Sequence, residues 1–115
     1  MMTRILLIED DADIREGVRL LLSAEGYEII EADCGAKGLE QLDESIDLVI
    51  LDVMMPGIDG MAAAREIRCF DAAADIVFLT SSPGFAYESY GVRALEYLLK
   101  PISAKLLFPV LDQLS

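Results

Sequence analysis

The stretch "RILLIEDDADIREGVRLLLSAEGYEIIEA" (residues 4–32) changes its hydrophobic pattern twice, and these changes decide the fold class. It opens with the continuous apolar run Ile5–Ile8, whose length suits a strand covered on both faces. Residues 12–25 then carry apolar side chains at helical spacing, and Gly26 follows as a stop signal. A second short apolar run, 27–32, completes the unit. A strand, a helix and a strand in this order predict a right-handed crossover between parallel strands.

The same alternation continues along the rest of the chain. We expect further strands at 47–51, 75–80 and 95–99, and helices at 35–44, 60–69, 84–92 and 104–114. These elements predict one α/β domain over residues 1–115, with a doubly wound, five-stranded parallel sheet. We expect the strand order 2-1-3-4-5, which is one of the common orders of such sheets. Pro109 lies inside the last expected helix and should bend or shorten it.

The composition excludes several classes of function. Although 54% of the 115 residues are hydrophobic, no apolar run approaches the roughly 18 residues of a membrane span. The N-terminus reaches acidic residues too early for a signal peptide, so we expect a cytoplasmic protein without membrane partners. The net charge of −12 repels nucleic-acid phosphates and argues against direct nucleic-acid binding by this segment. The absence of histidine excludes histidine-based catalysis and histidine metal sites.

Polar residues stand at the ends of four expected strands, where open parallel sheets bind their ligands. Glu9 and Asp10 follow the first strand, and Asp52 follows the third. Thr80 ends the fourth strand, and Lys100 follows the fifth. The expected strand order makes the first and third strands neighbours, so Glu9, Asp10 and Asp52 should share one pocket.

Three carboxylates in one pocket repel one another. Two such charges about 4 Å apart cost roughly 4 kcal/mol at an effective dielectric constant near 20. Either one carboxylate takes up a proton or a cation joins them, and oxygen ligands with open positions favour Mg²⁺, for which Mn²⁺ could substitute. The cation would let Asp52 act as a nucleophile toward a phosphoryl group, with Lys100 and the Thr80 hydroxyl as further partners of that group. Nucleotide-binding motifs of the GxxxxGK[ST] or GxGxxG type do not occur.

The two remaining acids of the first cluster, Asp11 and Asp13, have a different expected role. Acidic side chains at a helix N-terminus cap it or complement its dipole. We therefore expect Asp11 and Asp13 to serve the helix that follows, while Glu9 and Asp10 serve the cation. Helix charge remains the alternative interpretation for Glu9 and Asp10 as well.

Four motifs, in order and at the strand ends, resemble those of a known family. They are "LLIEDD" (6–11) with Arg15 beyond it, "LVILDVMMPGIDG" (48–60), "VFLTSS" (77–82) and "EYLLKPI" (96–102). On these residues the chain resembles the receiver domain of two-component response regulators, from residue 4 to about 114. This resemblance implies the flavodoxin-like, CheY-like (βα)5 fold. The stretch "FAYESYGVRALEYLLKPIS" (85–103) also resembles receivers that precede a LytTR-type DNA-binding domain.

The resemblance implies a role for each matching residue. Asp52 matches the phosphoacceptor, which takes a phosphoryl group from a sensor histidine kinase. Glu9 and Asp10 match the acidic pair that binds Mg²⁺ together with Asp52, and the backbone carbonyl of Met54 matches a main-chain ligand of the metal. Lys100 matches the lysine that pairs with the phosphoryl group.

The resemblance also implies a switch. Thr80 matches the switch hydroxyl, and Tyr97 matches the aromatic side chain that follows it, although simple packing would also explain a tyrosine there. A change at these residues would alter an output surface formed by 84–92, 95–99 and 104–114, which is also a candidate homodimer face. The expected function is signalling that controls transcription, without enzymatic activity beyond the domain's own phosphorylation and dephosphorylation.

Two other functions stay open on the sequence. The chain could be a degenerate receiver that acts as a constitutive interaction module, although the complete set of site residues argues against this. It could also be a metal-dependent phosphohydrolase acting on external substrates, although no separate general base and no substrate-specificity loop are recognisable.

Overall fold

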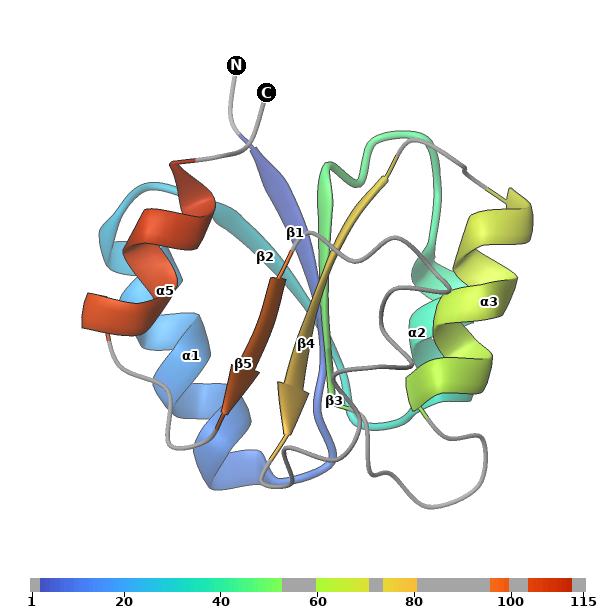
Figure 1. Cartoon of the computed structure of the whole chain (residues 1–115), viewed down its shortest axis with the longest axis horizontal. Helices are drawn as coiled ribbons and strands as arrows, with labels where there is room; N and C mark the ends of the chain where they lie inside the picture. Colours follow the sequence, from blue (N-terminus) through green and yellow to red (C-terminus); the bar gives the residue numbers. More distant parts are fainter. Residues whose placement is uncertain (1–2, 53–59, 71–73, 81–95, 100–103, 113–115) are drawn as a thin grey trace.

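The computed structural model describes residues 3–52, 60–70, 74–80, 96–99 and 104–112. These residues form three layers, with a parallel sheet in the middle and helices on both of its faces (Figure 1). The sheet has five strands in the order β2-β1-β3-β4-β5. The strands are β1 (Arg4–Ile8), β2 (Glu28–Ala32), β3 (Leu48–Asp52), β4 (Asp75–Thr80) and β5 (Glu96–Leu99). The helices are α1 (Ala12–Ala24), α2 (Gly35–Gln41), α3 (Gly60–Phe70) and α5 (Ala104–Leu111). The predicted fold class and strand order are confirmed.

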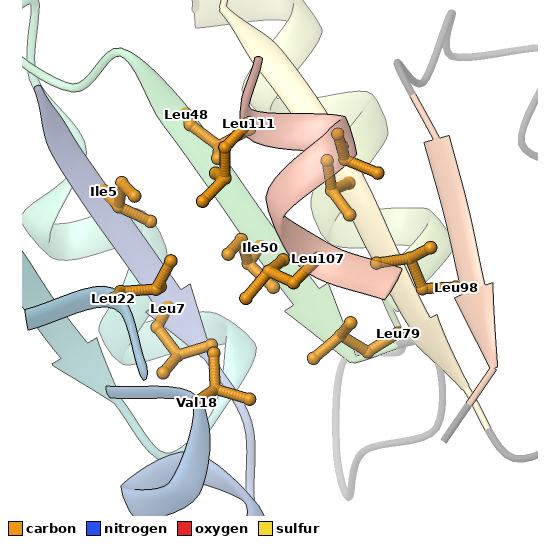
Figure 2. Close-up of a cluster of buried hydrophobic side chains, with 12 residues drawn as sticks. Ile5, Leu7, Val18, Leu22, Leu48, Ile50, Leu79, Leu98, Leu107 and Leu111 are labelled. Carbon is orange, nitrogen blue, oxygen red and sulfur yellow. The ribbon is translucent and has the colours of Figure 1, made fainter. Parts of the chain in front are cut away.

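Two buried clusters, one on each face of the sheet, attach the helices to it. Side chains alternate along β1, so Leu6 and Ile8 join the cluster under α2 and α3, while Ile5 and Leu7 join the cluster under α1 and α5. Figure 2 shows the second cluster, in which Leu107 of α5 packs among side chains of the central strands. Because β1 and β3 are covered on both faces, their apolar runs are continuous, as the sequence indicated.

The helix bounds differ from the expected ones for local reasons. The helix expected over 35–44 ends at Gln41, because the Asp43 side chain accepts a hydrogen bond of 2.8 Å from the Ser45 N–H and forms a turn there. The segment expected as a helix at 84–92 lies outside the described residues. Among the described helices, none combines the length and the apolar character that crossing a membrane requires.

Helix α5 runs through Pro109 and ends at Leu111, three residues before the expected end. The proline removes one intrahelical hydrogen bond, but its ring lies on the exposed side of the helix. Intrahelical bonding resumes beyond it, since the Asp112 N–H donates to the Phe108 carbonyl at 3.1 Å. The helix therefore keeps Leu107, Val110 and Leu111 in the core despite the proline.

Helix α1 ends in a Schellman motif, which directs the chain into β2. Gly26 has a φ of 89°, in the left-handed region that glycine adopts readily. The Gly26 N–H donates to the Ser23 carbonyl at 3.1 Å, and the Tyr27 N–H donates to the Leu22 carbonyl at 3.2 Å. This confirms the stop signal expected at Gly26.

Replacing Gly38 with alanine should destabilise the fold, because α2 packs very closely on β1 at this glycine. An added Cβ would overlap the Ile8 Cδ1 and lie 2.7 Å from the Ile8 Cγ1, and Ile8 is fully buried. We expect the free energy of unfolding to fall by about 1–3 kcal/mol, the usual cost of overpacking. Gly17→Ala in α1 is the matched control, since no heavy atom lies within 4 Å of its added Cβ. It should instead stabilise by about 0.5–1 kcal/mol in urea unfolding. Equal effects of the two changes would show that packing at Gly38 is not limiting.

Candidate functional site

The pairing of β1 with β3 places acidic residues side by side at the carboxyl ends of both strands. In the parallel register Ile8 lies opposite Leu51, so the next residues along the two strands are Glu9 and Asp52. Asp10 follows Glu9, and carboxylate oxygens of Glu9, Asp10 and Asp52 all lie within 4.8 Å of one another. The structure therefore brings these three predicted residues together at the edge where open parallel sheets bind ligands.

The three carboxylates differ in their exposure to solvent. Glu9 is fully buried and Asp52 is 2% exposed, whereas Asp10 is exposed. Water can screen little of the repulsion between the two buried groups, so a cation there would gain strongly from their charge. The donors are all carboxylate oxygens and Asp10 opens the cluster to solvent, which suits a hard cation such as Mg²⁺ that keeps several waters. The residues present therefore fit the metal that the sequence predicted.

The other two acids of the run belong to helix α1. Asp11 is its N-cap, and its Oδ1 accepts hydrogen bonds from the backbone N–H groups of Asp13 (2.9 Å) and Ile14 (3.3 Å). Asp13 lies in the first turn, where a negative charge complements the helix dipole. Asp11 and Asp13 thus serve the helix, as expected, while the metal role of Glu9 and Asp10 stays a prediction.

Replacing Asp11 with alanine should lower the free energy of unfolding by about 1 kcal/mol, because two N–H groups of the first turn lose their acceptor. Asp11→Asn is the control, since an asparagine side chain keeps a capping oxygen but not the charge. Urea unfolding should show near wild-type stability for the asparagine variant. An equal loss in both variants would show that the charge of Asp11, rather than its capping bonds, supports the helix.

The remaining predicted site residues are placed only in part. Thr80 is the last residue of β4, one position beyond Leu79, which lies opposite Asp52. Tyr97 lies in β5, on the strand that pairs with β4. Their backbones are therefore at the expected strands, while their side chains, together with Met54 and Lys100, lie outside what the structure describes. The roles of these four residues stay predictions.

A surface hollow of about 270 Å³ adjoins the end of β2 and is lined by Arg15, Glu31, Ala32, Asp33 and Lys37. Lys37 of α2 pairs with Asp33, four residues earlier in the chain, at 3.1 Å. This hydrogen-bonded contact lowers the pKa of Asp33 and raises the pKa of Lys37. Both side chains are largely exposed, so water screens the pair and it contributes little to stability.

Arg15 contacts the loop that carries Glu9 and Asp10, although the sequence motifs assigned it no role. From α1, its Nη1 donates a hydrogen bond of 2.8 Å to the backbone carbonyl of Glu9. A sequence signal did exist, because Arg15 lies one helical turn beyond Asp11 and so on the side of α1 that faces the preceding loop. That spacing alone does not say which acceptor the side chain would reach.

Comparison with known proteins agrees with this geometry. The model of the response regulator receiver domain family matches residues 5–112 of the chain. The chain belongs to this family. The transcriptional regulatory protein ResD of Bacillus subtilis (strain 168) is 40% identical over 109 residues, a match that covers 90% of this receiver and 44% of ResD. The uncharacterized transcriptional regulatory protein YrkP of the same organism is 39% identical over 105 residues, covering 90% of this receiver and 45% of YrkP.

Solved structures show the same fold over the full receiver. The response regulator TrrA of Thermotoga maritima, crystallised in complex with Mg²⁺–BeF, is 37% identical with a TM-score of 0.90. The alignment covers 99% of this chain and 100% of that chain. In contrast, the receiver spans less than half the length of the two curated relatives.

Proposed function

We propose that this receiver accepts a phosphoryl group from a sensor histidine kinase on Asp52, with Mg²⁺ held by Glu9, Asp10, Asp52 and the Met54 carbonyl. The observation that carries the proposal is the cluster of three carboxylates within 4.8 Å at the ends of β1 and β3. The Mg²⁺–BeF complex of TrrA, a relative with 37% identity, supports both the metal and the binding of a phosphoryl-like group.

The chemistry follows from the position of Asp52 at the end of a buried strand. An oxygen of the Asp52 carboxylate attacks the phosphorus atom of a phosphohistidine, and an O–P bond forms. The P–N bond to the imidazole breaks, and its electron pair stays on that nitrogen. Bound Mg²⁺ would supply the neutralising charge that lets an anionic nucleophile approach a phosphoryl group. The sheet positions the nucleophile, and the buried surroundings of Glu9 and Asp52 strengthen its electrostatic contacts.

Phosphorylation would then act as a switch. The aspartyl phosphate adds charge and strong hydrogen-bond acceptors at the strand ends. We expect Lys100 to pair with the phosphoryl group, the Thr80 hydroxyl to donate to it, and Tyr97 to reorient on β5. The altered face of β5 and α5 would change its preference for partners, including a second copy of the chain.

The role of the whole protein is likewise a proposal. We infer that residues 1–115 form one receiver domain that acts in cytoplasmic two-component signalling and does not itself bind nucleic acid. The names of ResD and YrkP, both transcriptional regulatory proteins, support an output in transcription. A LytTR-type output domain is a further expectation from the resemblance of residues 85–103.

Incubation with Mg²⁺ and an acyl phosphate donor tests the proposal. Intact-mass measurement should find one phosphoryl group per chain, and EDTA or Asp52→Ala should prevent its addition. Labelling that survives Asp52→Ala would contradict the proposed acceptor. No labelling at all would favour the constitutive interaction module, and turnover of an added phosphate ester would favour the phosphohydrolase.

A further inference from the structure

The loop between β1 and α1 carries two of the three clustered acids, and hydrogen bonds connect it to β2 and to α1. On one side, the Glu9 N–H donates to the Ala32 carbonyl at the end of β2, at 3.1 Å. On the other side, the Glu9 carbonyl accepts the 2.8 Å hydrogen bond from Arg15 Nη1, in a partly buried contact. Asp10 follows this anchored residue directly, and Asp11 is fixed as the N-cap of α1. The position of Asp10 thus depends on the bonds that hold its two neighbours.

The charge of Arg15 is matched by an acid that comes from a different element. Arg15 Nε lies 3.5 Å from Glu31 Oε1 on β2, and Arg19 Nε lies 3.8 Å from Glu31 Oε2. Arg19 also lies 3.8 Å from Glu16. These ion pairs form the series Arg15–Glu31–Arg19–Glu16, in which positive and negative side chains alternate. Arg15 can therefore bond to the Glu9 carbonyl while Glu31 balances its charge.

These ion pairs are partly exposed to solvent, so they contribute little to the free energy of unfolding. The side chains of Arg15 and Glu31 are 22% and 38% exposed, and pairs of this kind contribute about 0–1 kcal/mol. Holding the loop has a clearer consequence at the acidic cluster. The mutual repulsion of Glu9, Asp10 and Asp52 acts to push the loop away from β3, because Asp52 is fixed within a central strand. The bond from Arg15 opposes that movement.

We propose that Arg15 is a positioning residue of the acidic site, oriented by Glu31, which holds the Glu9–Asp10 loop in a geometry ready for the cation. The inference rests on the proposed function, since it takes Mg²⁺ as the cation. Partners that orient metal ligands indirectly commonly change metal affinity by about 10–100-fold when they are removed. Arg15 acts through a backbone carbonyl rather than a ligand atom, so we expect the low end of this range.

The test compares Arg15→Met with Arg19→Met in Mg²⁺ titrations followed by amide NMR shifts. Both changes remove a guanidinium that pairs with Glu31, but only Arg15 also bonds to Glu9. We expect the Kd for Mg²⁺ to rise about tenfold in Arg15→Met and to stay within twofold of wild type in Arg19→Met. Melting temperatures measured in EDTA should fall by similar small amounts in both variants.

The outcomes separate this inference from the proposed function. Wild-type protein that binds no Mg²⁺ would overturn both. If the wild-type protein binds Mg²⁺ and the two methionine variants bind it with equal affinity, only the role of Arg15 would be overturned. If Arg15→Met does not fold, Arg15→Lys takes its place in the test. A lysine keeps the positive charge, but it lacks the planar fork of donors with which Arg15 contacts the Glu9 carbonyl and Glu31 at the same time. A threefold or greater weakening would support the inference, and wild-type affinity would overturn it.

Discussion

Asp52→Asn should abolish phosphorylation and at the same time stabilise the metal-free protein. The substitution removes the nucleophilic carboxylate, so no aspartyl phosphate can form. It also removes one of three negative charges within 4.8 Å of one another, two of them buried. A pair of such charges costs roughly 4 kcal/mol at an effective dielectric constant near 20. Allowing for contacts that the lost charge also makes, we expect the free energy of unfolding in EDTA to rise by about 1–3 kcal/mol.

Urea unfolding in EDTA and phosphodonor labelling in Mg²⁺ measure the two effects of Asp52→Asn separately. Glu66→Gln is the control, because it removes the same charge from an exposed position on α3. That variant should change stability by less than about 0.5 kcal/mol and should be labelled normally. A destabilised Asp52→Asn protein would show that repulsion within the cluster is not the dominant effect of this charge.

Mg²⁺ should stabilise the wild-type protein, and Asp10→Asn should remove most of this effect. A ligand that binds only the folded state at about 100 times its Kd adds roughly 2.7 kcal/mol to the free energy of unfolding. Asp10 is the exposed member of the cluster, so its replacement should remove a metal ligand with little damage to the core. Asp13→Asn provides a close control, since Asp13 lies only three residues away in the first turn of α1.

Thermal unfolding with and without Mg²⁺ makes the comparison. Wild type and Asp13→Asn should gain a similar increase in melting temperature, and Asp10→Asn should gain little. Similar Mg²⁺ responses in Asp10→Asn and Asp13→Asn would mean that the acidic run attracts the cation only by its overall charge. The division of the run into a metal pair and a helix pair would then be wrong.

The fold was predictable because its signals are local. Continuous apolar runs such as Ile5–Ile8 mark strands that are covered on both faces, and Gly26 marks a helix end. The acidic cluster was predictable for a related reason: the strand order makes neighbours of two strand ends, and each strand end carries acids. Neither prediction required knowledge of side-chain conformation.

Features that depend on contacts between distant segments were not predictable. The role of Arg15 depends on the direction of one long side chain and on Glu31, which the second strand brings to it. The close approach at Gly38 depends on how α2 packs against Ile8. The early end of α2 was missed for a different, local reason, because a turn at Asp43 competes there with the helical pattern.

The register between β1 and β3 has a consequence for refolding. Side chains alternate between the two faces of the sheet, so a slip of one residue would exchange core side chains such as Ile8 and Leu7. The same slip would shift β1 along β3, and so move Glu9 relative to Asp52 and separate their carboxylates. A kinetically trapped chain with shifted strands could still be compact and helical, yet it would lack the clustered acids. The number of Mg²⁺ sites per chain after refolding would then count the correctly paired molecules, which helical content measured by circular dichroism cannot distinguish.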